Sequence, residues 1–422
     1  MPFASGGYCV PKRSRSGWVL QMILVINSGS SSLKFGLFTV AKAGQNLECL
    51  CRGNLSWISG RADFSITHHK PVIVEPSLIA AASGMNFNTV EEAYQCLCRW
   101  LHQFKEQPVI EKVCYRIVHG GHHYNAPVFI DESVMTKLEA LVPLAPLHQP
   151  LALQGVRIFR VQYPQALHVA CFDTAFHRSM PQVAQTFALP EDLRVQGVKR
   201  YGFHGLSYHY VVTRLPKLLS GEIPKRVIVA HLGSGASLCA LNAGVSVATT
   251  MSFSPLDGLP MATRSGAIDA AAVLYLLKEM KFSLDEVSDI LNTRSGLLGL
   301  SGVSGDVREL LQSDSEEARH ALDFYVYRIC QEIGGLMAIL QGVDALVFTG
   351  GAGAHCEQLR KRICAQFEWL GVRLDGAANK NNELAISEEE STIALYCLQT
   401  DEEWMMAKLS ADLSAANTRV ES

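Results

Sequence analysis

The stretch Ile23-Leu-Val-Ile-Asn-Ser-Gly-Ser-Ser-Ser-Leu33 has an internal counterpart about 200 residues later, Val227-Ile-Val-Ala-His-Leu-Gly-Ser-Gly-Ala-Ser237. Each stretch has four apolar residues, typical of a buried strand, then a polar residue, a variable position, Gly-Ser and a run of small residues. On a hairpin, such small residues let backbone N–H groups approach an anion closely. One Gly-Ser hairpin would be an ordinary turn. The pair predicts two related domains that face one another across a cleft.

The rest of the chain alternates strand and helix patterns. A third strand-to-glycine junction occurs at Ala345-Leu-Val-Phe-Thr-Gly-Gly-Ala-Gly353. Apolar residues at three- and four-residue spacing predict helices over 268–280 and 318–340, and a further helix over 134–141 follows a candidate cap at Asp131 or Ser133. This alternation predicts an α/β architecture in which helices cover the sheets.

The length of the chain, 422 residues, favours two domains over a single hydrophobic core. We place the boundary near 169–173 and expect the last helix, from about Asp401, to return to the first domain. The expected division is 22–172 plus 400–422 for the N-terminal domain and 173–399 for the C-terminal domain. Residues 1–21 carry Lys12, Arg13 and Arg15 but no apolar signal region, so we expect a disordered extension or an upstream start ahead of Met22, with a targeting segment as the alternative.

Composition excludes several classes of protein. Apolar residues make up 48% of the chain and charged residues 18%, which is typical of a well-buried enzyme and not of a disordered chain. The formal net charge of −3 gives no reason to expect nucleic acid or an anionic membrane as a partner. The segment 227–256 lacks Asp, Glu, Lys and Arg, but its Gly, Ser, Thr, Asn and His content argues against a membrane span.

The twelve cysteines form no CxxC pair or His-flanked cluster. Zinc and redox motifs are therefore not indicated. We interpret these residues as ordinary thiols in a reducing cytosol.

The common phosphate-binding motifs are missing from the sequence. It contains neither GxxxxGK[ST] nor the HRD and DFG set of protein kinases, and the loop at 351–353 lacks the third glycine of a dinucleotide fold. Any phosphate must be held by a different set of loops.

Four polar clusters combine Arg, Asp or His with small or aromatic neighbours, and we expect each at the end of an apolar strand, where open α/β sheets gather their site residues. They are Tyr115-Arg116-Ile-Val-His-Gly-Gly121, Cys171-Phe-Asp173-Thr-Ala-Phe176, Arg200-Tyr-Gly-Phe-His204-Gly205 and Pro260-Met-Ala-Thr-Arg264-Ser-Gly266. Taken singly, each Arg or His is more often structural than catalytic. Taken together, they predict a polyanion site in which the Arg pair neutralises phosphoryl oxygens and the Asp holds a metal or orients the acceptor.

Two of these motifs resemble a known family. Asn27-x-Gly29-Ser30-Ser31-Ser32-x-Lys34 is similar to the first signature of the acetate kinases, and Tyr201-Gly-Phe-His204-Gly205 with 231–237 resembles the second. The resemblance runs from about Ile23 to the acidic segment 401–403.

The resemblance implies the acetate and sugar kinase/Hsp70/actin fold, in which two domains with the same core bind nucleotide between them. It also implies a cytoplasmic homodimer, Mg²⁺ with Mn²⁺ as an alternative, and ATP as co-substrate. The implied reaction is the reversible, ATP-dependent phosphorylation of acetate to acetyl phosphate, with ADP as the other product, in acetyl-CoA biosynthesis.

The resemblance also implies roles for individual residues. The magnesium site corresponds to Asn27 and Glu402, with Glu403 as the alternative acid, and the first phosphate-side loop to Ser30, Ser32 and Lys34. In the catalytic set, Arg116 and Arg264 resemble the pair that flanks the transferring phosphoryl group. His204 resembles a further donor to that group and, with Arg264, a transition-state stabiliser. Asp173 matches the essential acid, and His148 and His231 match the histidines of the cleft.

The remaining implied contacts are with the two substrates. The apolar pocket for the acyl group corresponds to Val118, Leu147, Phe203 and Pro255, with Arg116 beside them. The nucleotide-binding positions are Lys34, His231, Gly233, Ser234, Gly235, Asp306, Val307, Arg308, Gly351, Ala352, Gly353 and His355.

The chemistry of a carboxylate acceptor suits this set of residues. Such an acceptor is already ionised at neutral pH, so the site must position two anions and neutralise their charge, with no proton to remove. Arginine suits this task because its planar fork can bridge oxygens on adjacent groups. An in-line transfer is expected, with His204 as a hydrogen-bond donor. The alternative for His204 is a packing role beside Phe203.

Some positions depart from the family pattern. Ser234 stands where Asn is usual, Ala354 and His355 replace Glu and Asn, and Ala267 replaces an Asp. The first three would face the nucleotide, so we expect an active enzyme with altered nucleotide selectivity. A propionate or butyrate kinase of the same fold stays open, because one methylene changes selectivity by only about 1–3 kcal/mol. The alternative from another class is a non-catalytic, nucleotide-binding switch.

Overall fold

The computed structural model describes residues 21–29, 32–40, 47–58, 61–69, 76–83, 85–104, 109–219 and 221–420. Ser30 of the expected phosphate-side loop and the expected extension up to residue 20 lie outside these ranges. The strands are β1 Gln21–Ser28, β2 Ser32–Val40, β3 Leu47–Ile58, β4 Arg61–His69, β5 Val109–Ile117, β6 Val128–Phe129, β7 Leu167–Phe172, β8 Arg226–Leu232, β9 Ala236–Asn242, β10 Val245–Thr249, β11 Ala345–Thr349 and β12 Ala394–Cys397.

Helices connect and cover these strands. The α-helices are α1 Pro76–Ser83, α2 Val90–Leu101, α3 Glu132–Ala140, α4 Gln149–Gln162, α5 Gln182–Gln185, α6 Glu191–Val195, α7 Gly205–Leu218, α8 Ala270–Lys278, α9 Leu284–Thr293, α10 Gly296–Ser301, α11 Val307–Gln312, α12 Glu316–Leu340, α13 Gly350–His355, α14 Glu357–Ala365, α15 Gly376–Lys380 and α16 Glu402–Val420. Three short 3₁₀ helices are η1 Val142–Leu144, η2 Ala175–Ser179 and η3 Glu368–Leu370.

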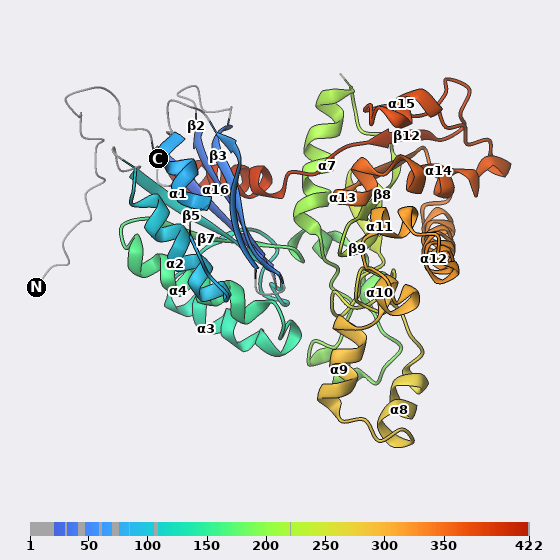
Figure 1. Ribbon diagram of the computed structural model, residues 1–422, viewed down its shortest axis with the longest axis horizontal. Helices are drawn as coiled ribbons and strands as arrows, with labels where there is room; N and C mark the ends of the chain where they lie inside the picture. Colours follow the sequence, from blue (N-terminus) through green and yellow to red (C-terminus); the bar gives the residue numbers. More distant parts are fainter. Residues whose placement is uncertain are drawn as a thin grey trace, which may run out of the picture.

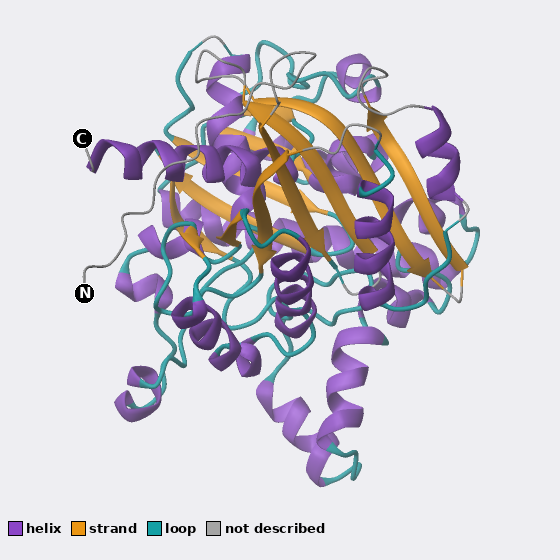
Figure 2. Cartoon of the chain, turned by 90° about the vertical axis from the view of Figure 1, so that its left-hand side faces the viewer, coloured by secondary structure: helices purple, strands orange, loops and turns teal. Residues whose placement is uncertain are grey.

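The strands form two separate sheets (Figures 1 and 2). The first has the order β4-β3-β2-β1-β5-β7-β6 and the second β10-β9-β8-β11-β12. In the first sheet β1 pairs antiparallel with β2 and parallel with β5, and in the second β8 pairs antiparallel with β9 and parallel with β11. The two hairpins predicted from the repeated stretch are therefore confirmed, and each lies beside a parallel strand in its own sheet.

Each central strand is buried on both faces, because its side chains alternate between two layers of helices. In β1, Leu24 and Ile26 belong to the core under α2 and α4, whereas Ile23 and Val25 pack with Met406 of α16. This arrangement explains why the repeated stretch reads as a continuous apolar run.

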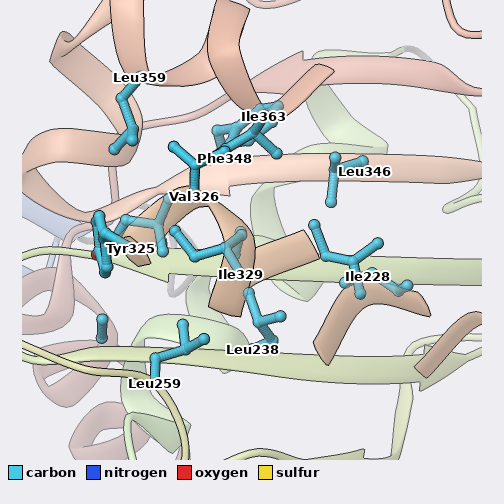
Figure 3. Close-up of a cluster of buried hydrophobic side chains, with 14 of the residues drawn as sticks. Ile228, Leu238, Leu259, Tyr325, Val326, Ile329, Leu346, Phe348, Leu359 and Ile363 are labelled. Atoms are coloured by element: carbon cyan, nitrogen blue, oxygen red, sulfur yellow. The ribbon is translucent and has the colours of Figure 1, made fainter. Parts of the chain in front are cut away.

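The second sheet repeats this two-layer arrangement. In β8, Ile228 packs with residues of α12, whereas Val227 and Val229 pack with α7. Figure 3 shows the α12 side of this core, where Ile329 lies beside Ile228 and Leu238.

The helices α7 and α16 lie between the two sheets and contact one another. The rings of Tyr210 and Trp404 meet edge to face at 5.7 Å, and the guanidinium of Arg214 lies 5.4 Å from the Trp404 ring. The chain leaves the second sheet after β12 and enters the first through α16 (Figure 1). The α16 helix packs against β1, β2 and β5 of the first sheet.

The predicted helices form with small changes at their ends. The helix expected over 268–280 is α8, that expected over 318–340 is α12, and that expected over 134–141 is α3. The N-cap of α3 is Asp131 and not Ser133, because Oδ1 of Asp131 accepts the N–H of Val134 at 2.7 Å. None of the described helices has both the length and the apolar character needed to cross a bilayer.

The expectation that all four polar clusters lie at strand ends is only half right. Arg116 and Asp173 lie at the ends of β5 and β7. In contrast, 200–205 leads into α7, and 260–266 belongs to the long connection between β10 and α8. Tertiary folding, and not strand direction, brings the last two clusters to the site.

A buried arginine ties the third glycine loop to the helices behind it. Arg360 of α14 is fully buried, and its guanidinium donates to the carbonyl oxygens of Gly353 (2.9 Å) and Asn379 (2.7 Å) and to the side-chain oxygens of Asn379 (2.7 Å) and Asn382 (2.6 Å). All these acceptors are neutral, so the position of the cation depends on hydrogen bonds alone.

We predict that Arg360→Met lowers the free energy of unfolding by about 3 kcal/mol, because it leaves several buried acceptors without a donor. Urea denaturation followed by circular dichroism measures this change. The matched control is Arg362→Met in the same helix, which removes a partly exposed ion pair with Asp323 and should cost less than about 1 kcal/mol. Equal losses in the two variants would contradict the role assigned to Arg360.

Candidate functional site

A cavity of about 470 Å³ lies where the two sheets face one another. It is formed by residues at the ends of β1, β5, β7, β8 and β11 and at the start of α16. Its lining comprises Asn27, Gly29, Ser32, Lys34, Arg116, Val118, His148, Asp173, Phe203, His204, His231, Gly233, Ser234, Gly235, Pro255, Arg264, Gly350, Gly351, His355, Gln399, Thr400, Glu402 and Glu403. The α7 and α16 helices both begin at this cavity, so the positive ends of their dipoles favour an anion there.

An ion pair joins the first two polar clusters. The guanidinium of Arg116 donates to Asp173 through Nη2 (2.6 Å to Oδ2) and Nε (3.0 Å to Oδ1), and Nη1 lies 3.3 Å from Oδ1 of Asn27. Asp173 is 1% exposed, and burial raises its pKa. Burial would lower the pKa of Arg116, but Asp173 and Glu402 raise it instead. The arginine therefore stays charged and holds the carboxylate in place.

Two acidic residues at the start of α16 meet Asn27. The Asn27 amide nitrogen donates to Oε1 of Glu403 (2.8 Å) and to Oε2 of Glu402 (3.2 Å). Burial opposes ionisation of Glu402, but the charge of Arg116 holds its pKa below the usual range. Burial and the neighbouring Glu402 raise the pKa of Glu403.

These oxygen atoms are of the kind that Mg²⁺ prefers. Across the residues that the structure describes, no three His, Cys, Asp or Glu side chains are grouped as a complete metal cage. A site made of one or two carboxylates and an amide still fits Mg²⁺, because this ion usually keeps waters and binds substrate phosphates as further ligands. Asn27, Glu402 and Glu403 therefore fit a metal that arrives with a nucleotide.

Two histidines that line the cavity stack on one another. The rings of His204 and His231 have centroids 4.3 Å apart and planes 23° apart. His204 is the N-cap of α7 and has a left-handed backbone with φ of 58°. Burial, followed by the proximity of His231, lowers the pKa of His204 well below its ordinary value, and burial lowers that of His231 to about 4. Both rings are therefore neutral near pH 7.

Arg264 reaches the cavity from the connection between β10 and α8. Its Nη1 donates to the Pro255 carbonyl at 3.0 Å, and its Nη2 lies 3.3 Å from Nε2 of His148. Burial, then the charges of Arg264 and Arg116, lower the pKa of His148 to about 3. A neutral His148 can accept a hydrogen bond from Arg264 through Nε2, since an arginine only donates. His148 thus orients the second arginine of the site.

Three of the four residues expected in the acyl pocket line the cavity. Val118 and Phe203 are buried beside the charged groups, and Pro255 bonds Arg264 through its carbonyl. Leu147 does not reach the cavity and is 47% exposed. The apolar wall is therefore shorter than the sequence predicted.

The residues expected to bind nucleotide fall into two groups. The first lines the cavity and comprises Lys34, His231, Gly233, Ser234, Gly235, Gly351 and His355, with Ala352 and Gly353 following in α13. The second group is 306–308, which lies outside the cavity lining. Asp306 and Arg308 form an exposed ion pair of 2.6 Å with one another, and Val307 is buried.

The sequence did not predict some lining residues. Gln399 and Thr400 lie on the segment that connects β12 to α16, and the Thr400 hydroxyl has no hydrogen-bond partner among the described residues. The sequence does contain a pattern that could have predicted them, because the polar run Gln-Thr-Asp-Glu-Glu at 399–403 follows directly after an apolar strand. Gly350 also lines the cavity.

Known proteins resemble this chain over most of its length. The model of the acetokinase family matches residues 22–408. An acetate kinase of Nitrobacter hamburgensis is 44% identical over 407 residues, covering 95% of this chain and 99% of the relative. An acetate kinase of Methylocella silvestris is 42% identical over 390 residues, covering 92% and 96% respectively.

A solved structure extends the likeness to three dimensions. A propionate kinase from Francisella tularensis superimposes with a TM-score of 0.83 at 33% identity, covering 92% of this chain and 99% of that chain. The family and fold predicted from the sequence motifs are thus confirmed, as is the prediction of a phosphotransferase with a carboxyl group as acceptor. The chain belongs to the acetokinase family.

Proposed function

We propose that this protein is an acetate kinase that transfers the γ-phosphoryl group of ATP directly to acetate, giving acetyl phosphate and ADP in a reversible reaction. The observation that carries the proposal is the convergence of Arg116, Arg264 and His204 on one cavity beside short apolar walls. The two arginines would neutralise the acetate carboxylate and the γ-phosphate as these anions approach one another, and the neutral His204 would donate a hydrogen bond.

The residues would divide the work by charge. Acetate is ionised at neutral pH and attacks without loss of a proton, so a general base is not needed. Arg116 would pair with the acetate carboxylate and the incoming phosphoryl group, while Asp173 holds its guanidinium in place. Arg264, oriented by His148, and His204 would stabilise the charge on the equatorial oxygens in an in-line transition state.

We propose Mg²⁺ as the cofactor, with Mn²⁺ as an alternative. Asn27 and Glu402, which line the cavity, would hold it, with Glu403 beside them. When bound, the ion supplies positive charge to the β- and γ-phosphate oxygens. The protein's own contribution is to orient these ligands through the hydrogen bonds of the Asn27 amide.

The glycine loops would bind the nucleotide. Lys34 and the Gly233–Gly235 loop would contact the phosphates, and Gly351 and His355, which also line the cavity, would contact the rest of the nucleotide. We propose that 306–308 complete the nucleotide site. Because Ser234 and His355 replace the usual residues of the family, the preference among nucleoside triphosphates would differ from that of typical members.

Propionate is the second candidate acceptor. Because Leu147 lies away from the cavity, the acyl wall consists of Val118, Phe203 and Pro255 only, which leaves room for another methylene. A butyrate kinase needs still more space. A non-catalytic nucleotide switch is disfavoured, since it would not require Arg116, Asp173, His204 and Arg264 together.

We also propose that the protein acts in the cytoplasm as a homodimer without a nucleic-acid or membrane partner. The described cysteines are free thiols and most are buried, which is typical of a reducing compartment. We further propose that 22–172 with 400–422, and 173–399, behave as two domains. The two sheets, whose buried side chains fall largely into separate clusters, support that division.

The purified protein should form an acyl phosphate from ATP and acetate at saturating Mg²⁺. Trapping the product with hydroxylamine as the hydroxamate measures it directly, and parallel reactions with propionate and butyrate rank the acyl pocket. We expect acetate to react, with propionate next. No hydroxamate from any of the three acids with several nucleoside triphosphates would show a protein that has kept the fold without the reaction.

Arg264→Ala should lower kcat by about two to three orders of magnitude with a small effect on ATP binding, because its charge is needed most in the transition state. Arg264→Lys keeps the charge but loses the planar fork, so we expect an intermediate rate. Steady-state kinetics and nucleotide titration separate the two effects. Near-normal turnover of Arg264→Ala would remove this residue from the catalytic set.

Asn27→Ala should raise the Mg²⁺ concentration needed for half-maximal activity, because the amide orients the acidic residues of the metal site. Titrating activity with Mg²⁺ at fixed ATP measures the shift. Glu402→Gln and Glu403→Gln tested in parallel identify the acid that matters more, and we expect Glu402. An unchanged metal dependence of Asn27→Ala would contradict its role.

A further inference from the structure

Each of the two stacked histidines contacts a serine hydroxyl through the same ring nitrogen. Nδ1 of His204 lies 2.8 Å from Oγ of Ser237, and Nδ1 of His231 lies 2.8 Å from Oγ of Ser207. Both Nε2 atoms face the second glycine loop. A Cβ atom added at Gly235 would lie 3.2 Å from Nε2 of His204, and one added at Gly233 would lie 3.8 Å from Nε2 of His231. Both rings thus use Nδ1 for the protein and leave Nε2 for the cavity.

We propose that Ser237 and Ser207 donate to these Nδ1 atoms and thereby fix the tautomer that carries hydrogen on Nε2 in both cleft histidines. This inference rests on the proposed phosphoryl transfer, because it states how the two rings become donors toward the phosphates. Ser207, Tyr208 and Ser237 would then be positioning residues, which act through the histidines and do not touch substrate.

The physical reason is the single hydrogen of a neutral imidazole. When Nδ1 accepts a hydrogen bond, Nε2 must carry the hydrogen and can donate. In the other tautomer Nε2 would direct a lone pair at phosphoryl oxygens, which repels them. Burial, then the neighbouring His231 and the charges of Arg116 and Arg264, lower the pKa of His204 and disfavour an imidazolium there. Protonation therefore does not supply the second N–H. The neighbouring hydroxyl must therefore select the tautomer.

The direction of the hydrogen bond at Ser237 depends on Tyr208. Its phenol is fully buried and bonds Oγ of Ser237, and either hydroxyl can be the donor. When Tyr208 donates to Ser237, Ser237 can in turn donate to His204 in a cooperative chain. His204, Ser207 and Tyr208 lie at positions i, i+3 and i+4, so the first turn of α7 organises both rings.

Thr249 is a second partner of the Tyr208 phenol and allows the hydrogen bonds between Tyr208, Ser237 and His204 to run in the opposite direction. Its own hydroxyl hydrogen goes to the Leu238 carbonyl at 2.8 Å. If Tyr208 donated to Thr249, Ser237 could donate to Tyr208 and accept from Nδ1 of His204. Nε2 would then present a lone pair to the cavity, which makes the two directions distinguishable by experiment.

A third histidine supports the serine-to-Nδ1 direction. His177 has Nε2 at 2.9 Å from the Phe203 carbonyl and Nδ1 at 2.9 Å from Oγ of Ser246. A carbonyl only accepts, so in the neutral ring Nε2 carries the hydrogen and Ser246 donates to Nδ1. At His177, whose Nε2 bonds the carbonyl of Phe203 directly before His204, a serine therefore donates to Nδ1 in the same kind of pairing. His177 also anchors the left-handed turn that presents His204.

The first test is the tautomer itself. The full-length protein labelled with ¹⁵N-histidine is examined by NMR at neutral pH, and His204→Gln and His231→Gln assign the two signals. We expect an unprotonated Nδ1 and a protonated Nε2 in both rings. A protonated Nδ1 in His204 of the wild-type protein overturns the proposal. Because this measurement needs no turnover, it distinguishes failure of the tautomer proposal from failure of the proposed function.

The second test is kinetic. Ser237→Ala should lower kcat about 10- to 100-fold with KM for acetate changed less than about threefold, because a fixed donor is lost in the transition state. Ser237→Thr keeps the hydroxyl and should recover most of the rate, and Tyr208→Phe should lower it several-fold. Ser410→Ala, a buried serine of α16 away from the cavity, is the control and should match the wild type.

Thermal unfolding of each variant shows whether it is folded. A folded Ser237→Ala variant with wild-type kcat overturns the proposal. So does a folded Ser237→Thr variant that is as slow as Ser237→Ala, because packing and not the hydroxyl would then decide the rate.

Discussion

The buried ion pair between Arg116 and Asp173 organises the cleft. It joins the carboxyl ends of β5 and β7 and extends through Asn27 to the acidic start of α16. A buried cation and anion persist only when each is paired and hydrogen-bonded, so every neighbour of the pair is constrained. The backbone N–H of His204 also bonds Asp173, which ties the second glycine motif to the same pair. The charges that would meet the substrates are thus fixed before any substrate arrives.

Close approach of backbone segments is the second constraint. A Cβ atom at Gly205 would lie 2.1 Å from the Asp173 carbonyl oxygen, and one at Gly350 would lie 2.7 Å from the Leu232 carbonyl oxygen. Gly350 also has φ of +77°, which side chains rarely adopt. These glycines let chain segments from both halves meet at the cavity, where larger residues would separate the arginines from the histidines.

The sequence predicted the features that depend on local pattern. Four apolar residues followed by Gly-Ser identify β1 and β8, and parallel strands bring Arg116 and Asp173 to one edge. Features that depend on tertiary folding were missed or misplaced. Leu147 is near His148 in sequence but is exposed, and Gln399 reaches the cavity only because the chain crosses from β12 to α16. The contact of Ser237 with His204 joins a strand to a helix cap, and no spacing in the sequence reveals it.

The position of α16 has a consequence for biosynthesis. The face of the first sheet that contains Ile23, Val25 and Cys171 is covered by Met406 and Ala407, which lie far downstream of β7 in the chain. Domains usually fold from the N-terminus while the ribosome is still working. The strands β1 to β7 are therefore synthesised well before the helix that covers this face. A nascent chain that has not yet reached α16 leaves apolar surface uncovered, and a premature stop codon just before α16 removes both this cover and the acidic residues of the cleft.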